Sequence, residues 1–101
     1  MKKLYRYEIE YRSDDGDTQI RLWEFPVIRE TDFCYFINPV YYPHKEKRVL
    51  KTAMNTYAFD SKDKAKDHFI RRTNTRIRWF HFWIEECEKG LELIKEEKTN
   101  D

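Results

Sequence analysis

The stretch from Ser61 to about Lys98 constrains the fold most, because its apolar residues follow the spacing of one long helix. Two interleaved sets recur every seven residues over four heptads: Ile70, Ile77, Ile84 and Leu91, and three positions later Thr73, Phe80, Cys87 and Ile94. Such a repeat is typical of a helix that packs along a second helix. Asp60 or Ser61 can serve as the N-cap, Asp63 adds an acid to the first turn, and no proline follows.

The length of this helix predicts that one small sheet cannot cover it. About 35 residues span about 50 Å, whereas a sheet of five-residue strands is only about 17–20 Å deep. Either the helix folds back near Gly90 or the Trp79–Trp83 region, or a second chain supplies the cover. We favour a second chain, in a dimer or larger homo-oligomer, because only a lone glycine interrupts the pattern. The expected oligomer interface consists of Ile77, Phe80, Trp83, Ile84, Cys87 and Leu91.

The first half of the chain has the patterns of strands. Residues 3–12 alternate aromatic or apolar with charged side chains, residues 13–17 form a turn, and residues 18–25 form a second strand that Pro26 ends or confines to an edge. Residues 33–37 are apolar on both faces and should form the central strand, and extended segments follow at 48–52 and 55–59. We therefore expect an α+β fold, with a four- to five-stranded, mostly antiparallel sheet before one long, possibly kinked helix.

Length and composition limit the class of protein. The 101 residues suit one domain, with a sheet part at 1–59, a helical part at 60–98 and a frayed tail at 99–101. A net charge of +1 provides no global basic field and disfavours nucleic-acid binding.

Cys34 and Cys87 lack metal-binding spacing and should be reduced core residues. The chain begins with charged residues rather than an apolar run and contains no segment of transmembrane length, so we expect a cytoplasmic protein without membrane contact.

Residues 71–78 contain four arginines and no acid. Arg72 and Arg76 are four residues apart, so they stand on one face of the helix, within reach of one phosphate or pyrophosphate. Arg71 and Arg78 point away from that face. The alternative is structural: Arg72 and Arg76 extend from the edge of the packed face or pair with strand carboxylates such as Glu8, Glu10 or Glu24.

Aromatic residues near the start of the helix could supply a stacking wall for a base. The aromatic candidates are Tyr57, Phe59 and Tyr42, and Asn55 is a further candidate for the same site; ordinary core or turn packing is the alternative for each. Trp79, Phe80, Phe82 and Trp83 surround the helix on all sides, which favours a partner or oligomer surface.

Evidence for catalysis is weak. Only Gly16 and Gly90 are present, so there is no Gly-rich phosphate loop. His81 and Glu85 have a spacing that permits metal ligation, but no third ligand follows at a recognisable spacing. We therefore expect a protein that is not an enzyme and needs no cofactor or metal.

Residues 51–72, KTAMNTYAFDSKDKAKDHFIRR, combine an aromatic-Ala-aromatic element, a Ser-Lys cap and an Arg-rich helix. This combination resembles the Thoeris anti-defence sponge family of small phage and prophage proteins. The resemblance implies oligomers of strand-plus-helix protomers that sequester cyclic ADP-ribose-type immune signals without cleaving them. It also implies that the adenine stacks on Tyr57 or Phe59 and that Arg72 and Arg76 hold the phosphates.

The predicted function is therefore a phage-encoded anti-defence protein that binds and withholds a phosphorylated nucleotide signal, of the cyclic ADP-ribose or cyclic oligonucleotide type, in the bacterial host. The alternative is a protein–protein inhibitor of a bacterial defence effector, similar in role to an anti-CRISPR protein, that uses the aromatic face of the helix.

Overall fold

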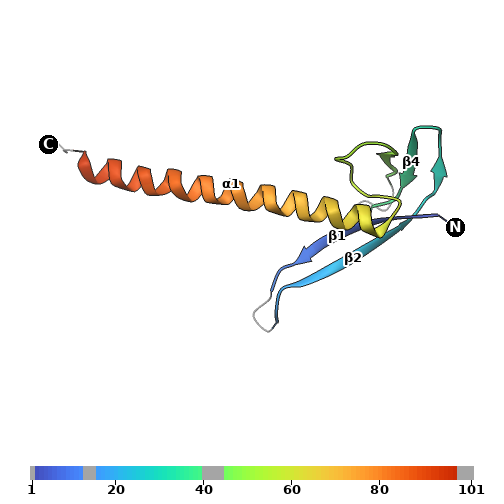
Figure 1. The fold of residues 1–101 in the computed structure, drawn as a ribbon, viewed down its shortest axis with the longest axis horizontal. Coiled ribbons are helices and arrows are strands. Elements are labelled where there is room, and N and C mark those ends of the chain that lie inside the picture. Colours follow the sequence, from blue (N-terminus) through green and yellow to red (C-terminus); the bar gives the residue numbers. More distant parts are fainter. Residues whose placement is uncertain (1, 13–15, 40–44, 98–101) are drawn as a thin grey trace. The chain divides into compact units, whose positions relative to one another are not determined.

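A computed structural model of the chain describes residues 2–12, 16–39 and 45–97 (Figure 1). It contains five strands followed by one helix: β1 (Lys3–Glu10), β2 (Gln19–Pro26), β3 (Arg29–Glu30), β4 (Cys34–Ile37), β5 (Lys47–Leu50) and α1 (Lys62–Glu96). All the strand pairs are antiparallel. The predicted α+β class is confirmed. By its internal contacts the chain divides into two units, Met1–Ile70 and a second that begins at Arg71.

The strands form two small sheets, so the expected single sheet is wrong. β1 and β2 form a hairpin, and β3, β4 and β5 form a three-stranded sheet with β4 in the centre. The change of sheet follows Pro26: the Val27 amide donates to the Lys2 carbonyl at 3.0 Å, and the Ile28 amide donates to the Phe36 carbonyl at 2.8 Å. Proline has no amide hydrogen to continue the first ladder, and strands commonly change sheets at such bends.

The central position of β4 confirms the prediction made from its apolar residues. Cys34, Tyr35 and Ile37 are buried, whereas the preceding Phe33 is exposed and lies outside the strand. Both sheets contribute to one core, which also includes a residue from the segment before the helix: Leu4, Phe25, Tyr35, Ile37, Val49 and Ala58.

The strand expected at 55–59 is replaced by a single bridge. The Tyr5 amide donates to the Phe59 carbonyl at 2.7 Å, and the Phe59 amide donates to the Tyr5 carbonyl at 2.9 Å. The residues before Phe59 make no ladder with a described strand, so the backbone of this segment pairs with the backbone of β1 at Phe59 only.

α1 begins and continues as the sequence predicts. Ser61 is the N-cap: its Oγ accepts a hydrogen bond from the Lys64 amide at 3.2 Å, and the Ala65 amide donates to the Ser61 carbonyl at 3.1 Å. The helix is continuous for 35 residues, and Gly90 lies inside it. A hairpin at Gly90 or between Trp79 and Trp83 is therefore excluded. Ala65 is the one buried residue among the described residues of α1.

We predict that Ser61→Ala destabilises the protein by about 1 kcal/mol, because it removes the side-chain acceptor of the Lys64 amide. The free energy of unfolding from urea denaturation measures this loss. Ser61→Asp is the matched control, since a carboxylate can accept the same bond and should keep the wild-type stability. Equal stability of the alanine variant and the wild type would contradict the role of Ser61 as the cap.

Candidate functional site

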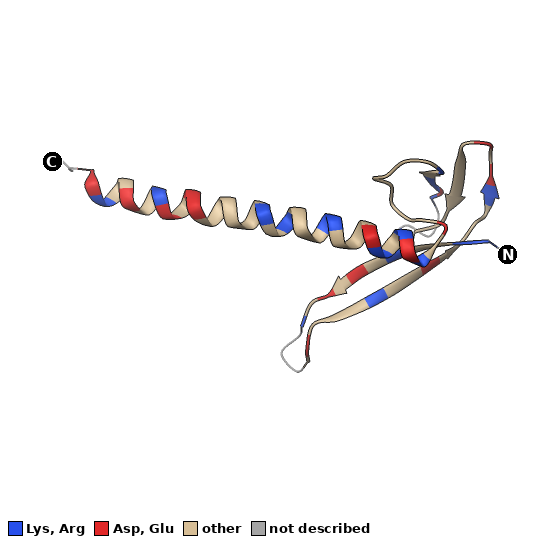
Figure 2. Cartoon of the chain, viewed as in Figure 1, with Lys and Arg blue, Asp and Glu red and all other residues tan. Residues whose placement is uncertain are grey.

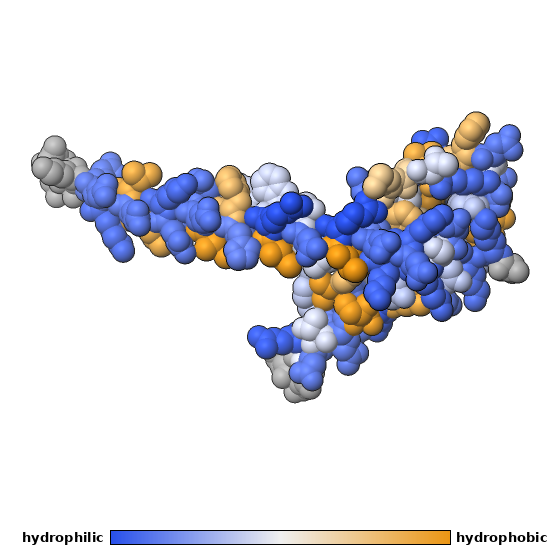
Figure 3. Space-filling view, viewed as in Figure 1, coloured by the Kyte–Doolittle hydropathy of each residue, from blue (hydrophilic) through white to orange (hydrophobic). Residues whose placement is uncertain are grey.

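The two heptad sets form one side of α1, which we call the heptad face, and its apolar side chains lie exposed in the single chain. The face consists of Ile70, Thr73, Ile77, Phe80, Ile84, Cys87, Leu91 and Ile94. Its Leu, Ile and Phe side chains are exposed from 45% at Ile70 to 62% at Ile94, and Cys87 is also exposed. Orange side chains along α1 mark part of this surface in Figure 3. The structure places all the residues of the expected oligomer interface on this helix: Ile77, Phe80, Trp83, Ile84, Cys87 and Leu91. The oligomer itself stays a prediction.

A second apolar surface extends from Trp83, which flanks the heptad face, to Trp79 and Phe82 on the side of α1 away from that face. The rings of Trp79 and Phe82 meet edge to face with centroids 5.8 Å apart, and those of Phe82 and Trp83 meet with centroids 5.4 Å apart. Thr75, Arg78, Trp79 and Phe82 line a shallow hollow of about 440 Å³. Three adjacent rings give this side of the helix an aromatic surface that suits an apolar partner.

The four arginines of residues 71–78 follow the predicted helical spacing. Arg72 and Arg76 stand one turn apart; Arg72 is half-buried and Arg76 is exposed. Arg78 donates to the Thr75 hydroxyl at 3.3 Å, within the same helix. No acid occurs between residues 71 and 84, so this part of α1 carries a concentrated positive charge.

Three strand carboxylates, Glu8, Glu10 and Glu24, each pair with a cation on their own hairpin. Lys3 pairs with Glu24 at 3.6 Å, Arg21 pairs with Glu10 at 3.1 Å, and Arg6 pairs with Glu8. The Lys3–Glu24 and Arg21–Glu10 pairs run diagonally across the hairpin, because Lys3 lies opposite Pro26 and Glu10 lies opposite Gln19, whereas Arg6 and Glu8 belong to the same strand.

The predicted stacking residues have structural contacts within the first unit. The Tyr57 ring packs 5.6 Å from that of Phe25, and two cations lie over it, Arg6 at 4.5 Å and Lys47 at 4.4 Å from its centroid. Arg6 also donates to the Tyr57 carbonyl at 2.7 Å. Tyr57 therefore contributes to the core of its own unit.

Phe59 and Asn55 differ in their surroundings. The Phe59 ring lies 4.9 Å from the His68 imidazole, and its backbone forms the bridge to Tyr5. Asn55 is exposed, and Tyr42 lies outside the described residues.

Tyr57 and Phe59 belong to the unit Met1–Ile70, whereas Arg72 and Arg76 belong to the other unit. A joint nucleotide site therefore stays a prediction.

Cations also lie over the aromatic rings of the three-stranded sheet. Lys2 and Lys51 lie 4.6 and 5.0 Å from the Tyr35 centroid, and Arg29 lies 3.7 Å from that of Phe36. A hydrogen bond from Lys51 to Glu30 at 2.7 Å lowers the pKa of Glu30. The sheet thus uses cation–π contacts to cover its rings.

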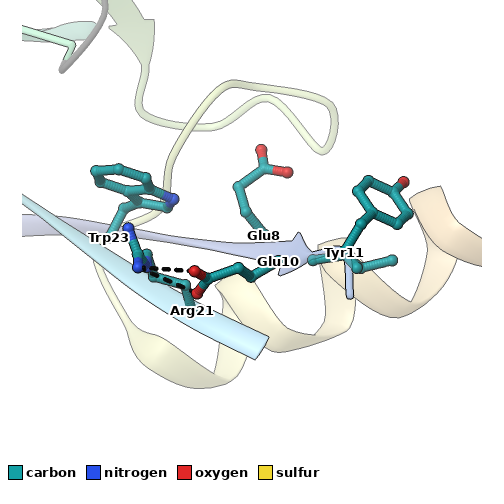
Figure 4. A pocket seen from close by; sticks show the side chains of 6 residues that line it. Glu8, Glu10, Tyr11, Arg21 and Trp23 are labelled. Carbon is teal, nitrogen blue, oxygen red and sulfur yellow. Dashed lines mark hydrogen bonds and ion pairs between the residues drawn. The ribbon is translucent and has the colours of Figure 1, made fainter. Parts of the chain in front are cut away.

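A hollow on the β1–β2 hairpin was not predicted from the sequence (Figure 4). It has a volume of about 360 Å³ and is lined by Glu8, Ile9, Glu10, Tyr11, Arg21 and Trp23. Arg21 pairs with Glu10 and lies 5.6 Å from the Trp23 centroid, so the cation most suited to an anion is engaged by a carboxylate. These side chains come from two strands, so the sequence indicates the hollow only when the register of β1 and β2 is known; that register places Glu8 opposite Arg21.

Within the described ranges, no group of three histidine, cysteine or carboxylate side chains could hold a metal ion. His81 and Glu85 thus have no third ligand among those residues. In the same part of the chain no helix combines the length and the apolar character needed to cross a membrane, since α1 is long but rich in charge.

Comparisons with protein-family models, with curated proteins and with solved structures find no match to this chain. Its function therefore has to be inferred from its own geometry.

We predict that Tyr57→Leu destabilises the protein by about 1–2 kcal/mol, because it removes the ring over which Arg6 and Lys47 lie. Tyr57→Phe keeps the aromatic face and is the matched control, with nearly wild-type stability. Urea denaturation of both variants measures the difference. If the leucine and phenylalanine variants unfold at the same urea concentration, the two cations contribute nothing through the ring.

Proposed function

We propose that the protein is a non-catalytic binding protein that acts through helix–helix association between its own copies along the heptad face of α1. The observation that supports this proposal is the exposure of that face over four heptads, from Ile70 to Ile94. A function of this kind needs no pocket and no cofactor. It needs an apolar face that remains available for a partner.

The energetics favour such a role over that of a solitary surface helix. Full burial of one Leu, Ile or Phe side chain contributes about 1.5–3 kcal/mol, and this face carries six such side chains at 45–62% exposure. Helices in water take most of their stability from packing of an apolar face rather than from propensity. Apolar surface of this extent usually marks an interaction site.

The aromatic surface formed by Trp79, Phe82 and Trp83 extends the proposal to a target protein. If the heptad face is used for assembly, Trp79 and Phe82 stay on the outer side of the helix, where aromatic rings often dominate binding energy. This arrangement fits an inhibitor that covers a bacterial defence effector.

We predict that Ile84→Glu weakens self-association of the chain at least about a hundredfold, or about 3 kcal/mol, because it places an unpaired carboxylate on the heptad face. Thr75→Glu is the matched control: it adds the same charge on the opposite side of α1 and should leave association unchanged. Light scattering at micromolar concentration measures the mass, and far-ultraviolet circular dichroism checks that the helix persists. A monomeric wild-type protein would overturn the proposed function.

A separate observation supports a second candidate function, the sequestration of a phosphorylated nucleotide. Residues 71–78 carry four arginines without an acid, and Arg72 and Arg76 share one side of the helix. Two guanidinium groups one turn apart can hold a phosphate by charge-assisted hydrogen bonds. In the anti-defence role that the family resemblance implies, the ligand would be a cyclic ADP-ribose-type or cyclic oligonucleotide signal.

We predict that Arg72→Ala or Arg76→Ala weakens nucleotide binding about ten- to a hundredfold, or about 1.5–3 kcal/mol, because each loses a charge-assisted contact. Arg71→Ala and Arg78→Ala remove the same charge from the other side and should cost less than about 1 kcal/mol. A thermal-shift screen with ADP-ribose, cyclic ADP-ribose and cyclic dinucleotides identifies the probe, and calorimetry measures affinity. Equal weakening by all four variants would indicate a diffuse electrostatic surface instead of a defined site.

A further inference from the structure

Charge is divided unevenly along α1. Residues 71–84 contain four arginines and no acid, whereas residues 85–96 contain five glutamates and two lysines. Figure 2 shows this division as blue in the middle of the helix and mostly red toward its C-terminal end. The two halves of one helical segment therefore have opposite net charge, and the exposed heptad face runs through both halves.

This division makes the segment complementary to a reversed copy of itself. In a parallel pair, the arginines of one copy would lie beside those of the other, and the glutamates beside glutamates. In an antiparallel pair, each basic half lies beside an acidic half. Complementary potentials of this kind steer partners together and fix their orientation.

The heptad spacing sets the register of an antiparallel pair. Along the heptad face the steps between neighbouring residues alternate: three positions from Ile70 to Thr73, then four from Thr73 to Ile77, and so on. On a reversed helix these steps match only when each residue of one heptad set lies level with a residue of the other set. One set is Ile70, Ile77, Ile84 and Leu91, and the other is Thr73, Phe80, Cys87 and Ile94. All eight positions find partners when Ile77 is level with Cys87 of the partner subunit and Phe80 is level with Ile84 of the partner subunit.

The same register also aligns the charges. It is symmetric about Phe82, so residues equally far on either side of Phe82 lie level. Arg72 and Arg76 are then at the same height along the axis as the partner's Glu92 and the partner's Glu88, respectively. The division of charge favours the antiparallel orientation, and the apolar spacing, an independent feature of the sequence, selects this register within it.

We propose that two copies of this chain pair antiparallel along α1 in this register, with a twofold axis at the level of Phe82. This proposal rests on the proposed function and adds to it the orientation and the register of the two helices. The interface is isologous, so it closes at two chains and leaves no unsatisfied end.

Native Cys87 provides a direct test of orientation, because disulfides form only when the two Cα atoms lie about 4.4–6.8 Å apart. In a parallel pair the two Cys87 residues face each other. In the proposed pair they are ten residues apart along the axis, or about 15 Å. Ile77 of one copy, in contrast, faces the partner's Cys87.

The experiment uses the full chain with Cys34→Ala, so that only thiols on the heptad face react. Diamide oxidises the thiols, and non-reducing electrophoresis detects covalent dimers. We expect no covalent dimer from Cys87 alone and a covalent dimer when Ile77→Cys is added. Removing Cys87 from that variant by Cys87→Ser should abolish the product. Ile70→Cys with Cys87 present is the matched control, and it should give no covalent dimer because that pair faces only in a register shifted by one heptad.

The outcomes separate this proposal from the proposed function. A monomer by light scattering overturns both. A dimer that crosslinks through Cys87 alone keeps helix association but overturns the antiparallel orientation, and crosslinking of the Ile70→Cys variant in place of the Ile77→Cys variant overturns the register. Salt gives a second readout without cysteine: raising sodium chloride from 0.05 to 0.5 M should weaken association several-fold, because it screens the attraction between the halves. Stronger association at high salt would overturn the proposal.

Discussion

The two backbone hydrogen bonds between Tyr5 and Phe59 fix the start of the helix against the hairpin. They join the first strand to the residues just before the cap at Ser61, across more than fifty positions of sequence. Ala58 beside them is buried in the core formed by both sheets, and Phe59 packs on His68 of the first helical turns. The cap, the core and the first turns of α1 thus share one anchor.

Local patterns predicted the elements well. The alternation in residues 3–12, the apolar segment of β4 and the cap before a long apolar repeat are each determined by neighbours in the sequence, and the structure has a hairpin, a central strand and a continuous helix at these places. The division into two sheets depends instead on contacts over long distances, such as that of Ile28 with Phe36. Pro26 indicated that a strand ends, but the sequence does not show which carbonyl accepts the hydrogen bond of the Ile28 amide.

The candidate site was only partly predictable for the same reason. The helical positions of Arg72, Arg76 and the heptad residues follow from spacing alone, because all of them lie on one element. The surroundings of Tyr57 do not, since Arg6 and Lys47 reach its ring from two different strands. The hairpin hollow likewise depends on the register of β1 and β2, which places Glu8 opposite Arg21.

The exposure of residues 71–96 also bears on how long the chain survives in a cell. This part of α1 has no buried side chain, so local opening there costs little free energy, and four arginines offer cleavage points to trypsin-like proteases. A second helix laid along the apolar face would protect the same bonds. Copies made in excess of their partner would then be trimmed while paired copies persist, and the amount of intact protein would follow the amount of assembly without a separate regulator.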